Sequence, residues 1–177
     1  MLSIELEALV ERLEELARPV IPWLVPGVDD RQVQATVGVL PPDEVTTWFG
    51  WCNGVELHEG QTQDDVNVIP GYAPISLREA MEAKLAYSGD PVLGDHWVPI
   101  LAGASGDIYA AVWQPGKPVQ VAGVLVGEAT EIEFASVEQM VNVFNECYRR
   151  GAFFVDSQRH LAMDPDIYDE VRDGIVR

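Results

Sequence analysis

Cysteine is scarce in this chain, which has only Cys52 and Cys147. Two cysteines do not make a disulfide framework, and without a C-x-x-C pair they do not outline a zinc site. The histidines His58, His96 and His160 form neither an H-x-x-x-H nor an H-E-x-x-H pattern. The sequence therefore predicts no metal ion and no cofactor.

Long apolar runs are also missing. No stretch is long enough to cross a bilayer, and the first residues are acidic and amphipathic, unlike a signal peptide. We therefore expect no membrane association and a location in the cytosol. The length of 177 residues and the hydrophobic fraction of 47% suit one globular domain with a proper core, spanning residues 1–177.

Basic residues are few. Twenty-nine acids against eleven bases give a net charge of −18. The excess is largest between Pro41 and Pro99, with ten acids against two bases. Such a surface repels nucleic acid and anionic membranes and attracts basic partners. Solvation alone explains the charge equally well, so both interpretations stay open.

Hydrophobic periodicity predicts an α+β protein. Helices are expected over residues 6–17, 43–52, 77–85 and 136–150, and strands over 97–101, 108–113, 119–126 and 131–134. The strands are joined by tight turns, so the central sheet should be mainly antiparallel, with helices covering one face. We also expect a short strand over 66–69, a polar connector from Asp29, and a last helix from Asp164-Pro165 to Val171.

The segment "WFGWCNG" lies near the end of the second predicted helix. Val45, Trp48, Phe49 and Cys52 follow helical spacing, and Asn53-Gly54 is expected to stop the helix in a left-handed conformation. Cys52 is then a buried thiol and not a nucleophile. Trp51 lies on the flank of this stripe, where it either packs on another element or is exposed to a partner.

No catalytic constellation is indicated. The loop from Gly103 to Asp107 is followed by a strand and has no lysine, so it is a hairpin turn and not a phosphate loop. A hydrolase or transferase using Cys52, His96 or Asp107 remains a third hypothesis. It requires these groups to converge in a pocket.

Four motifs in a fixed order resemble the SUKH superfamily. They are "LPPDE" running through Trp48-Phe49 to Asn53-Gly54, "PISLREA" at 74–80, "WVPI" and "GDIY" at 97–100 and 106–109, and "FAS" at 134–136 leading to Phe144. The superfamily includes fungal cell-wall-synthesis regulators and bacterial immunity proteins against polymorphic toxins. The match covers about residues 37–151, leaving out the N-terminal helix and a C-terminal extension over 152–177.

The resemblance implies an α+β fold and protein binding without catalysis. Our first hypothesis is an immunity protein that binds and neutralises a toxin domain, for example one of basic, nuclease type. The second is a regulatory or scaffold module with an endogenous protein partner. Exposed acids in predicted loops and one flanking tryptophan are the predicted partner-binding residues, namely Asp64, Asp65, Asp90, Asp95 and Trp51. The sequence does not indicate the oligomeric state.

Overall fold

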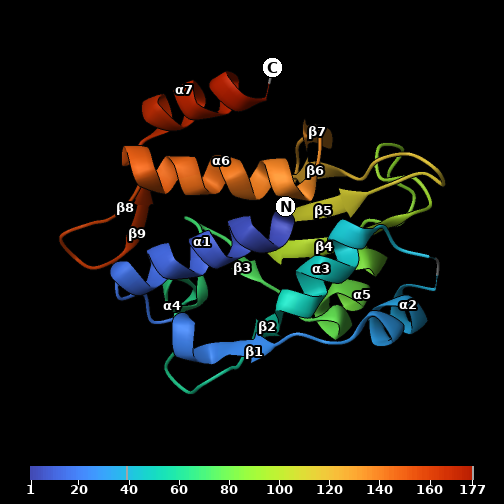
Figure 1. Ribbon diagram of the computed structural model, residues 1–177, viewed down its shortest axis with the longest axis horizontal. Coiled ribbons are helices and arrows are strands. Elements are labelled where there is room, and N and C mark those ends of the chain that lie inside the picture. The colour runs from blue at the N-terminus through green and yellow to red at the C-terminus, as the bar shows by residue number, and fades with distance from the viewer. Residues whose placement is uncertain (39, 177) are drawn as a thin grey trace.

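The computed structural model describes residues 1–38 and 40–176 (Figure 1). Its centre is a five-stranded antiparallel sheet, so the predicted α+β class with a mainly antiparallel sheet is confirmed. The strand order is β3-β4-β5-β6-β7. The strands are β3 (Ala73–Pro74), β4 (Trp97–Ala102), β5 (Ile108–Val112), β6 (Gln120–Val124) and β7 (Glu131–Phe134).

The two faces of the sheet are both buried, by different elements. Tyr109, Val121 and Phe134 point into the main core, together with side chains of the helices. Ile108 and Val124 point the other way, into a smaller cluster completed by residues such as Leu93 and Trp97. The expectation that helices cover one face therefore holds for the face toward the main core. The other face is also buried, by the smaller cluster.

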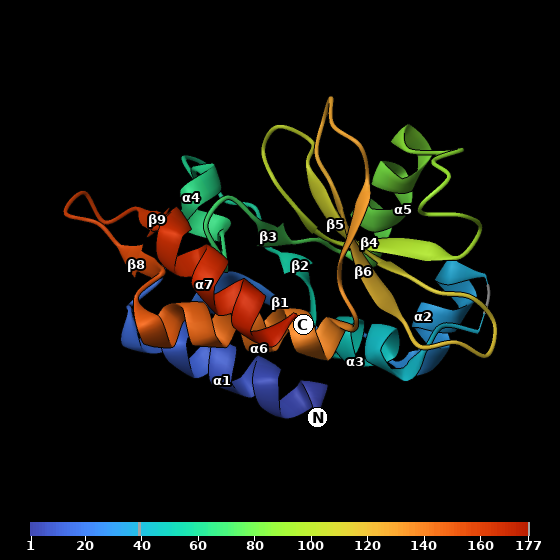
Figure 2. The same ribbon diagram turned by 90° about the horizontal axis from the view of Figure 1, so that it is seen from above.

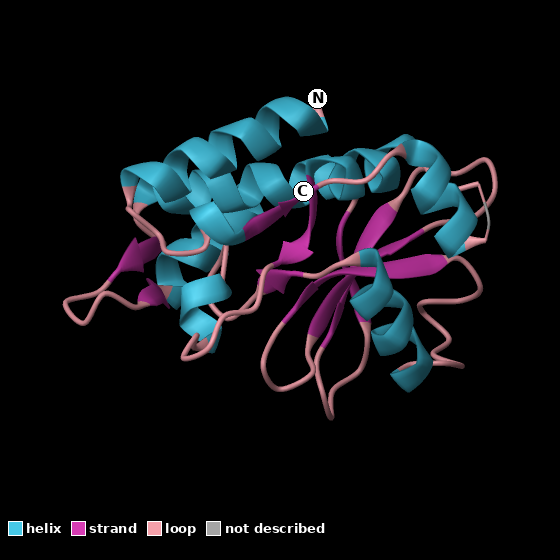
Figure 3. Ribbon diagram, turned by 90° about the horizontal axis from the view of Figure 1, so that it is seen from below, coloured by secondary structure: helices cyan, strands magenta, loops and turns pink. Residues whose placement is uncertain are grey.

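Seven helices are described, and most lie on one side of the sheet (Figure 3). They are α1 (Leu2–Glu15), α2 (Asp30–Val37), α3 (Asp43–Trp51), α4 (Gln63–Val66), α5 (Leu77–Ala86), α6 (Val137–Arg150) and α7 (Pro165–Ile175). Helix α6 lies between α1 and α7 (Figures 1 and 2). Helix α5 lies on the opposite side, beside β4.

Local hydrogen bonds start and end several helices as predicted. The Ser76 hydroxyl accepts from the Glu79 amide and the Glu79 carboxylate accepts from the Ser76 amide, which is a complete capping box. At α6, Ser136 accepts from the Gln139 amide, and Gly151 ends the helix in the left-handed conformation. These interactions need only neighbouring residues, which is why the sequence reveals them.

The end of α3 differs from the prediction. The helix stops at Trp51, and Cys52 already has extended backbone as the first residue of β2 (Cys52–Val55). Strand β2 pairs with β1 (Leu24–Pro26), which was not predicted. Gly54 does have a positive φ, of +87°, but inside this strand, where a Cβ would lie 2.7 Å from the Ser76 amide nitrogen. Close backbone approach, not helix termination, requires glycine there.

Two other predictions of secondary structure are wrong, and a third gives the end of a helix too early. Asp29 does not begin a polar connector; its carboxylate accepts from the Gln32 amide and caps α2. Residues 66–69 form no regular strand, because Val66 ends α4 and Ile69 makes only an isolated bridge. The predicted last helix exists, capped by Asp164, but it continues to Ile175, and a hairpin of β8 (Phe153–Val155) and β9 (Leu161–Met163) precedes it.

A buried cation connects the end of α1 with two distant segments. Arg18 is only 4% exposed, and its guanidinium donates to the carbonyl and the carboxylate of Asp64, at 2.6 and 3.0 Å. It also donates to the Arg159 carbonyl at 3.1 Å. The second carboxylate oxygen of Asp64 accepts from the Leu161 amide at 2.8 Å. The pair therefore links α1 and α4 to the β8–β9 hairpin.

We predict that Asp64→Ala lowers the free energy of unfolding by about 3 kcal/mol, because it leaves the buried Arg18 guanidinium without its anion. Asp65→Ala is the matched control. Asp65 carries the same charge on the same helix, but it only completes an exposed capping box with Thr62, so its loss should cost no more than about 1 kcal/mol. Urea unfolding of the two variants measures the difference. Equal losses would contradict a structural role for the Arg18–Asp64 pair.

Candidate functional site

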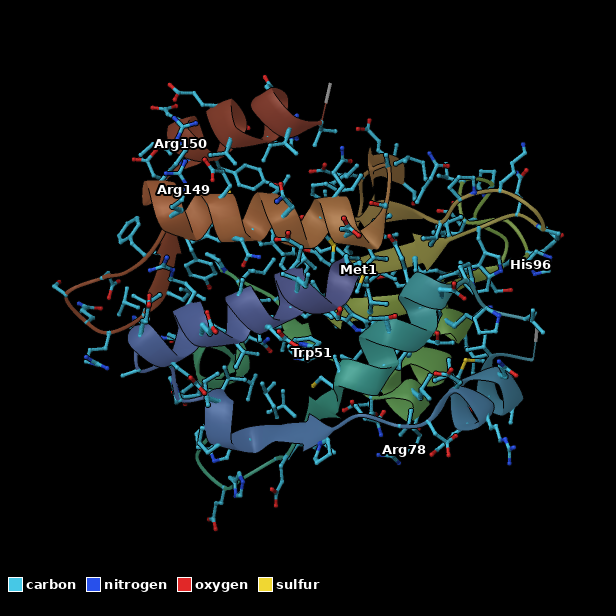
Figure 4. All side chains as sticks on the ribbon, viewed as in Figure 1. Met1, Trp51, Arg78, His96, Arg149 and Arg150 are labelled. Atoms are coloured by element: carbon cyan, nitrogen blue, oxygen red, sulfur yellow. The ribbon has the colours of Figure 1, made fainter. Side chains whose placement is uncertain are left out.

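A surface groove of about 540 Å³ lies where α1, α2 and α3 meet. Figure 4 shows Trp51 in the gap between α1 and α3. The groove is lined by one tryptophan, one buried leucine, three carboxylates and small or polar residues, namely Ser3, Leu6, Glu7, Asp30, Asp43, Thr46, Thr47, Gly50 and Trp51.

Trp51 forms the apolar part of this groove. Its indole packs edge-on against buried Trp48, with ring centroids 5.1 Å apart, and it remains partly exposed. Trp51 therefore packs on the core and is also partly exposed, and its binding to a partner stays a prediction. One part of the ring contacts the core, and another part lines the groove. A tryptophan held in this way offers a large rigid surface at little cost in conformational entropy.

Glu7, Asp30 and Asp43 are exposed and line the same groove as this ring. They come from the first half of α1 and from the first turns of α2 and α3. An aromatic face beside several carboxylates favours a guanidinium or an ammonium, because the ring quadrupole and the negative charges attract the same cation. The groove is thus suited to the Arg and Lys side chains of a basic protein.

Of the residues predicted to bind a partner, only Trp51 lines this groove. Asp64 is committed to Arg18, and Asp65 to the capping box of α4, so the expectation that they lie in a loop is wrong. Asp90 accepts from the Val92 and Leu93 amides and from the Thr130 hydroxyl. Asp95 is exposed, near Asp90, and both line another surface depression beside α5. Their binding roles stay predictions.

Glu7, Asp30 and Asp43 were not predicted as binding residues. A signal was present in α3, where Asp43, Thr46, Thr47, Gly50 and Trp51 recur at helical spacing on a face beside the apolar stripe. The other two carboxylates come from separate helices, and only the packing of those helices brings them to the same groove.

Cys52 is confirmed as a core residue. It is 1% exposed, its thiol donates to the Gly54 carbonyl at 3.1 Å, and burial raises its pKa to about 12. Cys147 is also buried, on α6, and burial raises its pKa to about 12. At neutral pH a thiol with such a pKa is almost entirely protonated and is a weak nucleophile.

We predict that iodoacetamide at pH 8 labels Cys52 in the native protein at least about 100-fold more slowly than in urea-unfolded protein, because only opening of the structure exposes the thiol. Peptide mapping by mass spectrometry distinguishes Cys52 from Cys147. Cys52→Ser should lower the free energy of unfolding by about 1–3 kcal/mol, since it buries a hydroxyl among apolar groups. Fast labelling of native Cys52 with a pH-dependent rate would show instead that the thiol is reactive.

The residues of the hydrolase hypothesis do not converge. The His96 ring stacks on Trp113 at one end of β5, with centroids 6.3 Å apart. Asp107 lies at the other end of β5, where its carboxylate accepts from the Val126 amide at 2.8 Å and from the Ser105 hydroxyl at 3.0 Å. A five-residue strand separates these ends by roughly 17 Å. Asp107 holds turns in place, as expected for a hairpin residue.

Within residues 1–38 and 40–176, no group of three or more His, Cys, Asp or Glu side chains is placed to hold a metal ion. Over the same residues, none of the helices combines the length and the apolarity that crossing a bilayer requires. A scan against protein-family models and a search of curated proteins found no match to the chain.

Proposed function

We propose that this protein is a protein-binding domain of the SUKH type, which binds a basic protein partner through the groove around Trp51. The observation that carries the proposal is the combination of a partly exposed indole with three carboxylates in one groove of about 540 Å³. The net charge of −18 adds long-range attraction for a basic partner. The resemblance to SUKH proteins adds the expectation of binding without catalysis.

The partner that we propose first is a toxin domain that acts on nucleic acid. Such a domain needs a basic surface to bind phosphates, and an acidic inhibitor can occupy that surface in place of the nucleic acid. Neutralisation would then take place in the cytosol, where both proteins meet. The second candidate, a regulatory module with an endogenous basic partner, uses the same groove but predicts no toxin.

Gene neighbourhood and co-purification separate these two candidates. We predict that the chain co-purifies with the product of an adjacent toxin-like reading frame and protects cells from it. Protection should be lost in the Trp51→Ala variant, provided that this variant remains folded. A chain that protects against no adjacent toxin and binds another basic protein would support the regulatory module instead.

Association kinetics test which face binds. We predict that the double variant Glu7→Gln with Asp43→Asn slows association by roughly a few-fold at low salt and weakens its dependence on ionic strength, because charges at the rim of an interface act mainly on the on-rate. Trp51→Ala should instead raise the off-rate, by about 30-fold if the indole contributes the ~2 kcal/mol of a central anchor.

The matched control is Asp90→Asn with Asp95→Asn, which removes the same charge from the surface beside α5. If this pair changes the on-rate and the Glu7–Asp43 pair does not, the partner binds beside α5 and not at the Trp51 groove. An on-rate that is insensitive to salt in every variant would show that the acidic surface does not attract the partner.

A further inference from the structure

A cavity of about 350 Å³ is lined by residues of the sheet, of α6 and of α7. Its size falls within the range of small-molecule sites, roughly 300–1,000 Å³. The walls come from the turn before β3, from the sheet, from α6 and from the C-terminal elements β8, β9 and α7. The cavity is distinct from the Trp51 groove and shares no residue with it.

Five aromatic rings line the cavity, those of Tyr72, Tyr109, Phe144, Phe153 and Tyr168. Tyr72 and Tyr109 lie 4.8 Å apart between ring centroids, and Tyr109 is 6.2 Å from Phe144. Phe153 and Tyr168 stack at 5.9 Å. All five rings line the cavity, so a ligand inside would pack against rigid aromatic side chains.

One carboxylate, that of Glu133, is held inside this apolar wall. Glu133 is partly buried on β7, and its side chain lies over Gly123 of β6. A Cβ at Gly123 would be 1.8 Å from a Glu133 carboxylate oxygen, so any other residue at 123 would displace the carboxylate. Glycine is unfavourable inside a strand, and here it creates the space that the carboxylate occupies.

One cation, that of Arg172, also lines the cavity, from α7. Among the ion pairs between described residues, Arg172 is joined to Asp173, at 3.8 Å, and not to Glu133. Its positive charge still lowers the pKa of Glu133, against the larger raising effect of burial. The cavity therefore contains two opposite charges, those of Glu133 and Arg172, which attract each other but do not form an ion pair.

We propose that this cavity binds a free α-amino acid with an aromatic or large aliphatic side chain. The ammonium group of the ligand would donate to Glu133, its carboxylate would accept from Arg172, and its side chain would pack among the five rings. A ligand with both charges can pair with both groups at once, and charge-assisted hydrogen bonds of this kind are the stronger ones in proteins. Neither the Trp51 groove nor a protein partner enters this inference.

Isothermal titration calorimetry of the full chain with L-phenylalanine tests the proposal. We expect saturable binding, at least about tenfold weaker binding of phenethylamine, which lacks the carboxylate, and a similar loss for 3-phenylpropionate, which lacks the ammonium. L-glutamate should not bind, because its side chain is charged. The absence of any binding of L-phenylalanine or L-leucine at millimolar concentration would overturn the proposal, and so would phenethylamine binding as tightly as L-phenylalanine.

Variants of Glu133 and Arg172 test which group of the ligand each charge binds. Glu133→Gln should weaken L-phenylalanine binding at least tenfold, and Arg172→Gln should do the same while leaving phenethylamine binding nearly unchanged. Glu131→Gln is the control, because Glu131 is exposed on the same strand and does not line the cavity. Unchanged affinity in the Glu133 variant, or an equal loss in the Glu131 variant, would contradict the assigned roles.

Stability measurements show whether Glu133→Gln remains folded. Glu133 interacts with Tyr109 on β5, Glu131 on β7, Tyr72 before β3, and Tyr168 and Arg172 on α7. Burial raises its pKa above the value in the unfolded chain, so the fold favours the protonated form, and stability is lost as the pH rises through the folded pKa. Glu133→Gln should therefore be more stable than the wild type at pH 7 without ligand, and the difference should shrink at acidic pH. If the Glu133→Gln variant is more stable than the wild type and still binds L-phenylalanine more weakly, the loss of affinity comes from the missing contact with Glu133 and not from unfolding.

Discussion

The buried guanidinium of Arg18 connects the two ends of the chain to its middle. A charge with 4% exposure requires anionic and carbonyl partners on several sides, and the chain supplies them from Asp64 and Arg159. The hydrogen bonds of the Arg18 guanidinium therefore help to fix where α4 and the β8–β9 hairpin lie relative to α1. Helix α7 follows that hairpin, so the position of the cavity wall that bears Tyr168 and Arg172 depends on the same interaction.

The two sites that we propose use carboxylates in opposite ways. In the groove, the exposed acids Glu7, Asp30 and Asp43 act through long-range attraction, which salt screens. In the cavity, Glu133 lies among aromatic rings, where burial opposes its charge. The groove suits a basic protein surface that associates quickly and at a rate that depends on salt. The cavity suits selective recognition of a small ligand, because a buried charge without its partner is costly. The two sites have no lining residue in common.

Local patterns in the sequence were sufficient for the meander and for most helices. The strands β4 to β7 are bounded by glycine-rich turns, and the helices α5 and α6 carry capping residues within their own first turns. The missed strands β1, β2, β3, β8 and β9 have two to four residues each, so periodicity gives little signal for them. They exist because a partner strand lies beside them. Asp64 could not be predicted for the same reason. No residue near it in the sequence indicates that it pairs with buried Arg18, 46 positions away.

Trp51 shows how far the candidate site was predictable. Its position off the apolar stripe of α3 left both core packing and exposure open. In the structure Trp51 is partly buried and lines the groove. The acids around it could not be predicted, since they come from the starts of different helices. Cys52 was assigned correctly to the core although the helix ends one residue earlier than expected, because the side chain of the first residue of β2 still points inward.

The outer strand β7 has a consequence for how copies of this chain meet. It stands last in the strand order, has four residues and carries Glu131 and Glu133. A sheet edge that is short and acidic is a poor template for a further strand, because a second copy would bring the same charges to it. Two molecules that approach along this edge repel each other before their backbones can pair. At high concentration the sheet should therefore resist growth into a continuous intermolecular β-structure.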